Sequence, residues 1–401
     1  MSKPKIRFKG YEEDWEQRKF EDVGSVAMCK RIFKEQTSDE GEVPFYKIGT
    51  FGSEPDAFIS RELFNEYKTK YQYPNKGDIL ISASGSIGRT VEFTGRDEYF
   101  QDSNIVWLKH GNEIDNSFLK VLYSVIEWSC EGSTIKRLYN DNFLKTEFML
   151  PKIDEQIKIG NYFSNLDHLI TLHQRKCEET KKLKKYMLQK MFPQNGKRVP
   201  EIRFAGFTDD WEQRKLGDVT ELKSASRVHK GEWTDSGVPF FRSSDVMAAI
   251  NGTTNEKAYI SEELYEKLSN ASGKLEEGDV LVTGGGSVGN PYIVPNNEPL
   301  YTKDADLLWI KNQGRFYPYF LYEYFFSPTF RIYLSNISHV GTIAHYTITQ
   351  LSETPISLPD IEEQIKVGEY FESLDRLITL HQRKYEELQK IKKFMLQNMF
   401  I

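Results

Sequence analysis

The chain contains one 40-residue sequence in two closely similar copies. Residues 153–192 read IDEQIKIGNYFSNLDHLITLHQRKCEETKKLKKYMLQKMF, and residues 361–400 read IEEQIKVGEYFESLDRLITLHQRKYEELQKIKKFMLQNMF. The copies are identical at 28 of 40 positions, and both contain LITLHQRK, 208 positions apart. Both are free of proline and rich in Lys, Glu, Gln, Leu and Met, a composition that favours helix. We therefore predict two helices, each about 60 Å long.

Apolar side chains recur along both predicted helices at steps of three and four residues, the spacing of a coiled-coil seam. The seam is apolar at both ends and polar in the middle, and two neighbouring helices can share it if they pair antiparallel. Its predicted members are Ile159, Tyr162, Leu166, Leu169, His173, Lys176, Thr180, Leu183 and Met187 in the first helix, and Val367, Tyr370, Leu374, Leu377, His381, Lys384, Leu388, Ile391 and Met395 in the second. The alternative is two surface helices packed on separate domains.

A second pair of similar segments frames the rest of the chain. Residues 4–23 read PKIRFKGYEEDWEQRKFEDV, and residues 200–219 read PEIRFAGFTDDWEQRKLGDV. The first long helix leads into the second copy of this segment, whereas the second helix ends where the chain ends and the first copy begins the chain. Joining the ends would close a ring of two units, so we predict pseudo-two-fold symmetry with neighbouring termini.

Between the repeated segments the two halves share only a skeleton. Two stretches of each half align: residues 76–88, KGDILISASGSIG, correspond to 277–289, EGDVLVTGGGSVG. Residues 105–110, IVWLKH, correspond to 307–312, LLWIKN. Their β-branched runs predict strands. Short helices are predicted at 60–71 and 261–270, with Ser60 and Ser261 as N-caps, and more buried helices at 118–129 and 319–330.

The predicted fold class is therefore α/β in the broad α+β sense, with two globular mixed domains on a helical spacer. The boundaries place a first domain at 1–152, a central helix at 153–192, a linker and second domain at 193–360, and a distal helix at 361–401. The inserts should share one fold and differ in surface.

The amino-acid composition excludes several classes of protein. With 39% hydrophobic and 28% charged residues over 401 positions, and no apolar run of membrane-spanning length, a soluble cytoplasmic protein is expected. The three cysteines are widely spaced and predict neither disulfides nor a zinc site. A net charge of −6 argues against a general nucleic-acid coat protein, so any contact with a polyanion must be local or shared with a partner.

Two short motifs resemble parts of known catalytic or cofactor-binding motifs but lack some of their residues. The glycine-rich turns at 85–88 and 284–289 lack the Lys-Ser/Thr of a nucleotide-binding loop, and tight turns are favoured, whose N–H groups could hold a DNA phosphate. Asn290-Pro291-Tyr292 resembles part of an adenine methyltransferase motif but lacks its second proline. We predict no catalytic residues and no metal ligands in this chain.

Basic and polar residues of the kinds that grip phosphates and read base edges recur in both inserts. In the first insert the candidates are Lys30, Arg31, Lys34, Ser84, Gly85, Ser86, Arg89, Lys136, Arg137, Tyr139, Asn140 and Asn142. In the second they are Lys223, Arg227, His229, Lys230, Arg242, Ser243, Ser244, Gly285, Gly286, Ser287, Thr342, His345 and Tyr346.

Together, DWEQRKFEDV and DWEQRKLGDV, the two GDILIS and GDVLVT skeletons, and the paired LITLHQRK helices resemble the specificity (S) subunit of type I restriction-modification systems. The resemblance covers essentially the whole chain. It implies two target recognition domains, each reading one half of a split, asymmetric DNA site, on an antiparallel coiled coil that sets the half-site spacing.

The same resemblance implies the partners and cofactors. Two modification (M) subunits would dock on the coiled coil and supply adenine methylation with S-adenosylmethionine. Restriction (R) subunits would supply translocation and cleavage with ATP and Mg²⁺. This chain would bind double-stranded DNA, no membrane and no cofactor, and would not be an enzyme by itself. The alternatives are the recognition subunit of a fused restriction-modification enzyme and a protein-binding repeat scaffold that does not bind DNA.

Overall fold

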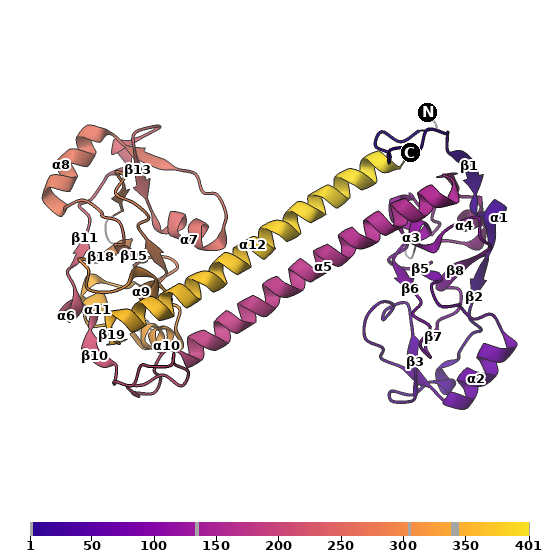
Figure 1. Ribbon diagram of the computed structural model, residues 1–401, viewed down its shortest axis with the longest axis horizontal. Coiled ribbons are helices and arrows are strands. Elements are labelled where there is room, and N and C mark those ends of the chain that lie inside the picture. Colours follow the sequence, from indigo (N-terminus) through magenta and orange to yellow (C-terminus); the bar gives the residue numbers. More distant parts are fainter. Residues whose placement is uncertain (1–2, 133–135, 304–305, 338–344, 401) are drawn as a thin grey trace. The chain divides into compact units, whose positions relative to one another are not determined.

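The chain divides into two compact units. The computed structural model describes residues 3–132, 136–303, 306–337 and 345–400. Unit 1 comprises residues 1–174 and 383–401, and unit 2 comprises residues 175–382. Both divisions fall inside the two long helices, α5 (Ile153–Lys190) and α12 (Ile361–Met399), which confirm the helices predicted from the repeat (Figure 1). Each unit therefore contains one part of each long helix.

The described residues of unit 1 form three small sheets. The largest has the strand order β2-β8-β5-β6, with β2 at Gly24–Met28, β8 at Ile105–His110, β5 at Ile79–Ser82 and β6 at Thr90–Glu92. The second has the order β4-β3-β7, with β4 at Phe58–Ile59, β3 at Val43–Tyr46 and β7 at Tyr99–Phe100. In the third, β1 (Glu16–Lys19) pairs antiparallel with β9 (Glu147–Leu150). Helices α1 (Phe20–Val23), α2 (Arg61–Lys70), α3 (Asn116–Val125) and α4 (Asn140–Lys145) complete the unit.

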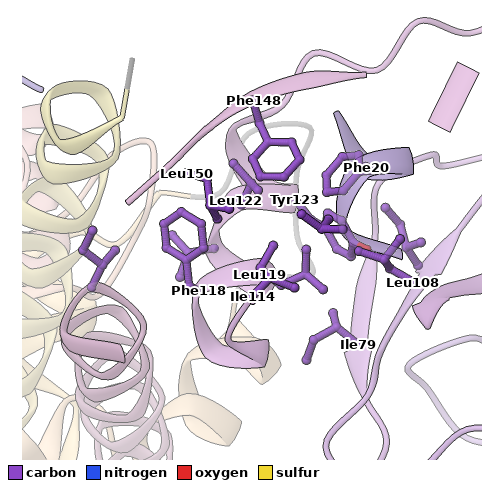
Figure 2. Packing of buried hydrophobic residues seen from close by; sticks show 14 of the residues in the cluster. Phe20, Ile79, Leu108, Ile114, Phe118, Leu119, Leu122, Tyr123, Phe148 and Leu150 are labelled. Carbon is purple, nitrogen blue, oxygen red and sulfur yellow. The ribbon is translucent and has the colours of Figure 1, made fainter. Parts of the chain in front are cut away.

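The main core of unit 1 lies between the largest sheet, α3 and α5. Figure 2 shows Phe20 and Phe148 facing each other near Tyr123, with their ring centroids 4.5 Å apart. The strand β8 alternates Val106 and Leu108 into this core, whereas Ile105 and Trp107 enter a second core on the opposite face of the sheet. That second core supports the smaller sheet and α2.

Unit 2 repeats this plan. Its largest sheet has the order β11-β18-β15-β16, with β11 at Leu222–Ser224, β18 at Leu307–Ile310, β15 at Val280–Thr283 and β16 at Pro291–Ile293. The second sheet has the order β12-β14-β13-β17, with β12 at Trp233–Thr234, β14 at Ala258–Ile260, β13 at Val238–Phe241 and β17 at Tyr301–Thr302. The strands β10 (Glu212–Lys215) and β19 (Pro355–Leu358) pair antiparallel. Its helices are α6 (Leu216–Val219), α7 (Ser243–Asn251), α8 (Glu262–Ser272), α9 (Pro318–Tyr324), α10 (Pro328–Ile337) and α11 (Ile348–Ser352).

The predicted N-caps are confirmed, and one predicted helix is wrong. Ser60 and Ser261 accept hydrogen bonds from the backbone N–H groups of the third residues after them, as capping serines do. The single helix expected at 319–330 is broken into α9 and α10. The break precedes Pro328, because a residue before proline is disfavoured in helical conformation. Pro328 then begins α10, where its missing N–H costs nothing.

A buried ion pair explains why the framing repeats are alike. In unit 1, Arg7 Nε and Nη2 donate to the two carboxylate oxygens of Glu155 at 2.7 and 2.8 Å. In unit 2, Arg203 makes the same bidentate pair with Glu363 at 2.6 and 2.7 Å. Both glutamates are almost completely buried at the starts of the long helices. Each pair fastens a framing segment to a long helix.

A glutamine and a glycine that recur in both long helices also hold each helix against its unit. The Gln156 side chain accepts from the Asp115 backbone N–H at 2.8 Å, and Gln364 accepts from the Tyr317 backbone N–H at 3.0 Å. One turn later, a Cβ at Gly160 would lie only 2.7 Å from the Phe118 backbone nitrogen. A Cβ at the matching Gly368 would lie 2.5 Å from the Tyr317 ring. The repeat therefore preserves a close approach between each long helix and the α3 or α9 helix on it.

The long helices pack antiparallel within each unit. In unit 1, Lys392 bonds to Asp167 at 2.5 Å, and in unit 2, Lys184 bonds to Asp375 at 2.7 Å. These pairs are the same pair under the repeat, because Asp375 and Lys392 lie 208 positions after Asp167 and Lys184. The antiparallel pairing that we predicted is confirmed.

The predicted seam is wrong at three positions of α5 and one of α12, where the next residue along the chain is the less exposed one. Instead of Leu169, Lys176 and Leu183, the less exposed face of α5 carries Ile170, Cys177 and Lys184. In α12 the same shift occurs at one position, where Ile378 is less exposed than the predicted Leu377. Lys384 and Ile391 are half-buried as predicted, and Ile391 packs against the core of unit 1. At the outer ends Phe163 and Phe371 are buried, while Tyr162 and Tyr370 lie at the core margin. Among the other predicted positions, those that pack in the cores are Ile159, Leu166, Met187, Val367, Leu374, Leu388, Ile391 and Met395. The polar members His173, Thr180 and His381 are half-buried.

The physical reason is the wide face that the long helices present to each unit. A stripe of two side chains per heptad suffices between two helices, but a helix that also covers a domain buries a broader face. That face includes Ile159 and Phe163, which contact the globular core.

Among the described residues, no helix is long and apolar enough to cross a membrane.

Candidate nucleic-acid interface

One short turn in unit 1 holds two of the basic groups predicted from the sequence. Residues 101–104 connect β7 to β8, and we call them the β7–β8 turn. Arg31 pairs with Asp102 at 3.1 Å, and Arg137 Nη2 donates to Ser103 Oγ at 2.8 Å. Ser84 Oγ donates to Asn104 Oδ1 at 2.8 Å. Segments more than one hundred residues apart in sequence thus meet at one site.

Arg89 joins this site through the first residue of the turn. Gln101 Oε1 accepts a hydrogen bond from the Ile48 backbone N–H at 2.9 Å, and Arg89 Nη2 donates to the Ile48 carbonyl at 2.6 Å. The Arg89 guanidinium carbon also lies 5.5 Å from the centroid of the Phe51 ring. Arg31 and Arg137 therefore contact the turn directly, whereas Arg89 is linked to it through Ile48.

Exposed aromatic rings accompany these cations. Arg137 lies 5.8 Å from the Tyr139 ring centroid, and Lys30 lies 5.2 Å from the Tyr71 ring centroid. Tyr139 is 49% exposed and Tyr71 is 43% exposed. A hollow of about 710 Å³ beside the turn is lined by Ser103, Glu131, Arg137, Tyr139, Asn142 and Lys145, among others. Its lining combines one guanidinium, one ammonium, amides and an aromatic face, which are groups suited to contacts with nucleic acids, together with the carboxylates of Glu131 and Asp141.

The glycine-rich turns are fixed by a hydroxyl group. In unit 1, Ser82 Oγ donates to the Ser86 carbonyl at 2.5 Å and accepts from the Arg89 backbone N–H at 2.9 Å. In unit 2, Thr283 Oγ1 likewise donates to the Ser287 carbonyl and accepts from the Asn290 N–H at 2.9 Å. Gly85 and Gly286 have positive φ angles of 67° and 71°, which glycine tolerates without strain. The turns directly follow β5 in unit 1 and β15 in unit 2, at the predicted interface.

The corresponding site in unit 2 contains different side chains. The Asp306 carbonyl accepts from Ser243 Oγ at 3.0 Å and from the Gly284 N–H at 2.7 Å. The Asp306 carboxylate pairs with Lys303. A Cβ added at Gly285 would lie 3.2 Å from Asp306 Oδ1 and 3.9 Å from His345 Nδ1. Ser243, Gly285 and His345, all sequence candidates, therefore meet around Asp306.

Other candidates in unit 2 are tied into the local fold. Arg242 pairs with Asp245 at 3.0 Å and lies 5.6 Å from the Trp233 ring centroid. Ser244 accepts from Asn255 at 2.9 Å. Lys223 donates to the Ser272 carbonyl at 3.4 Å, away from Asp306. Several further candidates stand exposed on the surface, namely Lys34, Lys136 and Asn140 in unit 1 and Arg227, His229, Lys230, Gly286 and Ser287 in unit 2.

Tyr346 is a wrong prediction as a DNA contact. Its side chain is 1% exposed and its hydroxyl bonds to Thr354, so it belongs to the core. Its burial could not be predicted locally, because a tyrosine beside a histidine is equally compatible with a surface position. Ser84 and Gly285 are also mostly buried, and they support the interface from beneath. Thr342 lies outside the described residues.

The Asn-Pro-Tyr segment has a structural role. Asn290 Nδ2 donates to the Ser287 carbonyl at 2.7 Å, and Asn290 Oδ1 accepts from Arg331 at 3.2 Å. Tyr292 packs on Phe241 with ring centroids 4.6 Å apart. The asparagine side chain is therefore occupied in holding the glycine-rich turn.

Sequence reasoning missed the residues that organise both sites. In unit 1, Asp102 and Ser103 bind Arg31 and Arg137, and Asn104 binds Ser84. In unit 2, Asp306 binds Lys303 and Ser243. The available signal was the polar QDSN segment placed directly before the strand at 105–110. A polar turn beside a buried strand end is a common place for binding groups.

A family model for the type I restriction modification DNA specificity domain matches the chain twice, at residues 12–182 and 208–390. The chain belongs to the type I restriction-modification DNA specificity family. Each match contains one of the two polar sites and the larger part of one copy of the long-helix repeat. The specificity domain is thus present twice in one chain.

Known proteins agree with this assignment. A type I restriction enzyme specificity subunit of Haemophilus influenzae is 56% identical over 155 residues, which are 37% of this chain and 40% of that protein. The MjaVIII specificity subunit of Methanocaldococcus jannaschii is 26% identical over 338 residues, covering 80% of this chain and 77% of that protein. The fold alone is shared with the crystal structure of a type I restriction-modification S subunit from M. genitalium, which aligns over 100% of this chain and 99% of that chain with a TM-score of 0.63 and 16% identity.

Both copies of the specificity domain also leave matched apolar side chains exposed on the long helices. Leu169 and Leu377 are equivalent under the repeat and are 39% and 44% exposed. Tyr186 and Phe394 form a second such pair, 49% and 55% exposed. Exposed apolar residues repeated at equivalent positions mark a candidate protein-binding surface that occurs twice.

Proposed function

We propose that this chain is the DNA-reading subunit of a type I restriction-modification complex. Each unit reads one half of a bipartite DNA site. The observation that carries the proposal is the pair of equivalent polar sites on a common frame, with Ser84, Asn104 and Arg137 in one unit and Gly285, Asp306 and His345 in the other. Different side chains on the same frame imply two different half-sites, so the whole DNA site is asymmetric.

The two long helices set the separation of the half-sites in this proposal. A helix of 38 residues, the length of α5, is about 57 Å long. A rigid spacer converts helix length into a fixed number of base pairs, as the dimer spacing does in other DNA readers. Supporting evidence is the antiparallel packing of α5 and α12 in both units, with its repeated Asp–Lys pair.

Partner subunits supply the chemistry. We infer two methyltransferase (M) subunits, one for each copy of the exposed apolar positions at Leu169 and Leu377. They bring S-adenosylmethionine and methylate adenine, while restriction (R) subunits bring ATP and Mg²⁺ and cleave foreign DNA. This chain contributes sequence recognition rather than catalysis, in the cytoplasm. Its net charge of −6 fits a protein whose partners complete the positive surface around DNA.

A gel-shift experiment tests the DNA reading directly. The chain is purified with and without a co-expressed methyltransferase subunit and titrated onto random duplex DNA at increasing salt. We expect binding by the complex, with an affinity that falls steeply as salt rises because lysines and arginines displace counterions from phosphates. Absence of binding in both preparations would favour the protein scaffold and contradict the proposal.

A further inference from the structure

Arg137 in unit 1 and His345 in unit 2 occupy equivalent positions. The residue after each one donates its backbone N–H to the glycine-rich turn: Leu138 to the Ala83 carbonyl at 2.8 Å and Tyr346 to the Gly284 carbonyl at 2.8 Å. In both units this following residue is buried. The next residue then begins a short helix as its N-cap, Tyr139 for α4 and Thr347 for α11.

This local geometry turns one side chain outward in each unit. The buried Leu138 and Tyr346 fix the inward direction, so their predecessors project the other way, over the glycine-rich turn. Arg137 is half-buried and His345 is exposed. The frame is therefore the same in the two units, while the side chain that it presents differs completely in shape and donor pattern.

The surroundings of Arg137 suit the recognition of a base edge. Ser103 Oγ takes one guanidinium N–H, and the Tyr139 ring lies 5.8 Å from the guanidinium carbon. A guanidinium carries several N–H donors in a rigid plane, so donors remain for a ligand. Because Ser103 and Tyr139 restrict the plane, less conformational entropy is lost when it binds.

We propose that Arg137 and His345 occupy the same base-reading position of the two specificity domains, and that Arg137 selects a guanine in the half-site read by unit 1. The proposal rests on the proposed function and names a residue that carries its specificity. Arginine binds the O6 and N7 acceptors of guanine with two parallel hydrogen bonds, a pattern that no other base offers in the major groove. His345 presents one small ring beside Asp306 and Gly285, so the base at the matching place in the other half-site is read by different groups.

Methylome sequencing of variants tests the proposal in the assembled complex. The chain and its methyltransferase subunit are expressed as wild type, Arg137→Ala and His345→Ala. We expect Arg137→Ala to lose its guanine preference at one position of one half-site and to leave the other half-site unchanged. His345→Ala should alter only the other half-site. A bipartite motif that keeps every guanine in Arg137→Ala would overturn the inference while leaving the proposed function intact.

A binding measurement covers the case in which Arg137→Ala stops methylation altogether. Duplexes carrying 7-deazaguanine at each guanine of the wild-type motif lack the N7 acceptor at one base. One of them should bind the wild-type complex roughly ten-fold more weakly, the loss expected for one base contact. The Arg137→Ala complex should show no further loss on that duplex. Equal weakening of both complexes on every duplex would contradict a contact from Arg137.

Discussion

At the residue scale, the two buried arginine–glutamate pairs are the contacts that the repeat preserves most clearly. Glu363 is 0% exposed and accepts both N–H groups from Arg203 and a third hydrogen bond from Trp211 Nε1 at 3.1 Å. The hydrogen bond to Glu363 raises the pKa of Arg203 above its ordinary value. A carboxylate in this position is stable only while its cation is present.

We therefore expect Arg203→Ala to lower the free energy of unfolding of unit 2 by about 3–5 kcal/mol, because it leaves a buried charge without its partner. Urea unfolding followed by intrinsic fluorescence measures the change. The matched control is Arg214→Ala, which removes an exposed pair with Glu212 and should change the free energy of unfolding far less than Arg203→Ala does. Equal effects of the two variants would show that Glu363 does not depend on Arg203.

A second buried carboxyl in unit 2 is less well satisfied. Glu323 bonds to Lys184 at 2.8 Å through Oε1, while its Oε2 is buried without a hydrogen-bond partner. Burial raises the pKa of Glu323 well above its usual range, and Lys184 only partly opposes that shift. The equivalent position in unit 1 is Val121, so this charge belongs to one half only.

The raised pKa of Glu323 predicts a pH dependence of stability. The folded state holds the proton more tightly than the unfolded chain, whose glutamate has a pKa of about 4.3. The stabilisation is fully present below that pH and is lost as the pH rises toward the folded-state pKa. Glu323→Gln should remove this slope and raise the free energy of unfolding at pH 8 by at least about 1 kcal/mol. Unfolding curves from pH 5 to 8 measure it, and Glu212→Gln serves as an exposed control. An unchanged slope in Glu323→Gln would assign the pH dependence to another group.

At the element scale, the long helices show where a sequence pattern is informative and where it is ambiguous. Composition and the repeat correctly predicted both helices and their antiparallel pairing. The same pattern allowed two adjacent stripes, because Leu169 and Ile170 are both apolar and differ by one residue. Only the tertiary packing decides between them, and it selects Ile170.

Adjacent substitutions test the corrected seam. Ile170→Asp places a charge against the core of unit 1 and should lower the free energy of unfolding by about 3 kcal/mol or more. Leu169→Asp changes an exposed position and should leave that free energy within about 0.5 kcal/mol. Leu169→Asp should instead weaken co-purification with the methyltransferase subunit. Retained co-purification in both Leu169→Asp and Leu377→Asp would contradict a docking role for this surface.

For a similar reason, the sequence could suggest candidate DNA-contact residues but could not show which of them lie together in one site. Arg31, Arg89 and Arg137 are suitable residues in any sequence, and nothing in their spacing says that they share a site. Arg31 and Arg137 meet because Asp102 and Ser103 of the β7–β8 turn bind them. Arg89 is linked to the same turn through Ile48 and Gln101. Such convergence depends on strand order, which one sequence without relatives does not reveal.

At the scale of the whole molecule, the two units share one duplicated fold and differ in the side chains that they present. One frame is built twice, fastened each time by an arginine–glutamate pair, a glutamine and a glycine on a long helix. The frame was predictable because its residues repeat. The half-sites were not, because each unit presents its own side chains at the end of the same strands.

Methylome sequencing of cells that express the wild-type chain with its methyltransferase subunit tests the central claim most directly. A bipartite reader with two unlike specificity domains should produce methylated adenines in one asymmetric motif, whose two different half-sites are separated by a spacer of fixed length and free sequence. A contiguous or palindromic motif, or methylation that does not depend on this chain, would contradict the account.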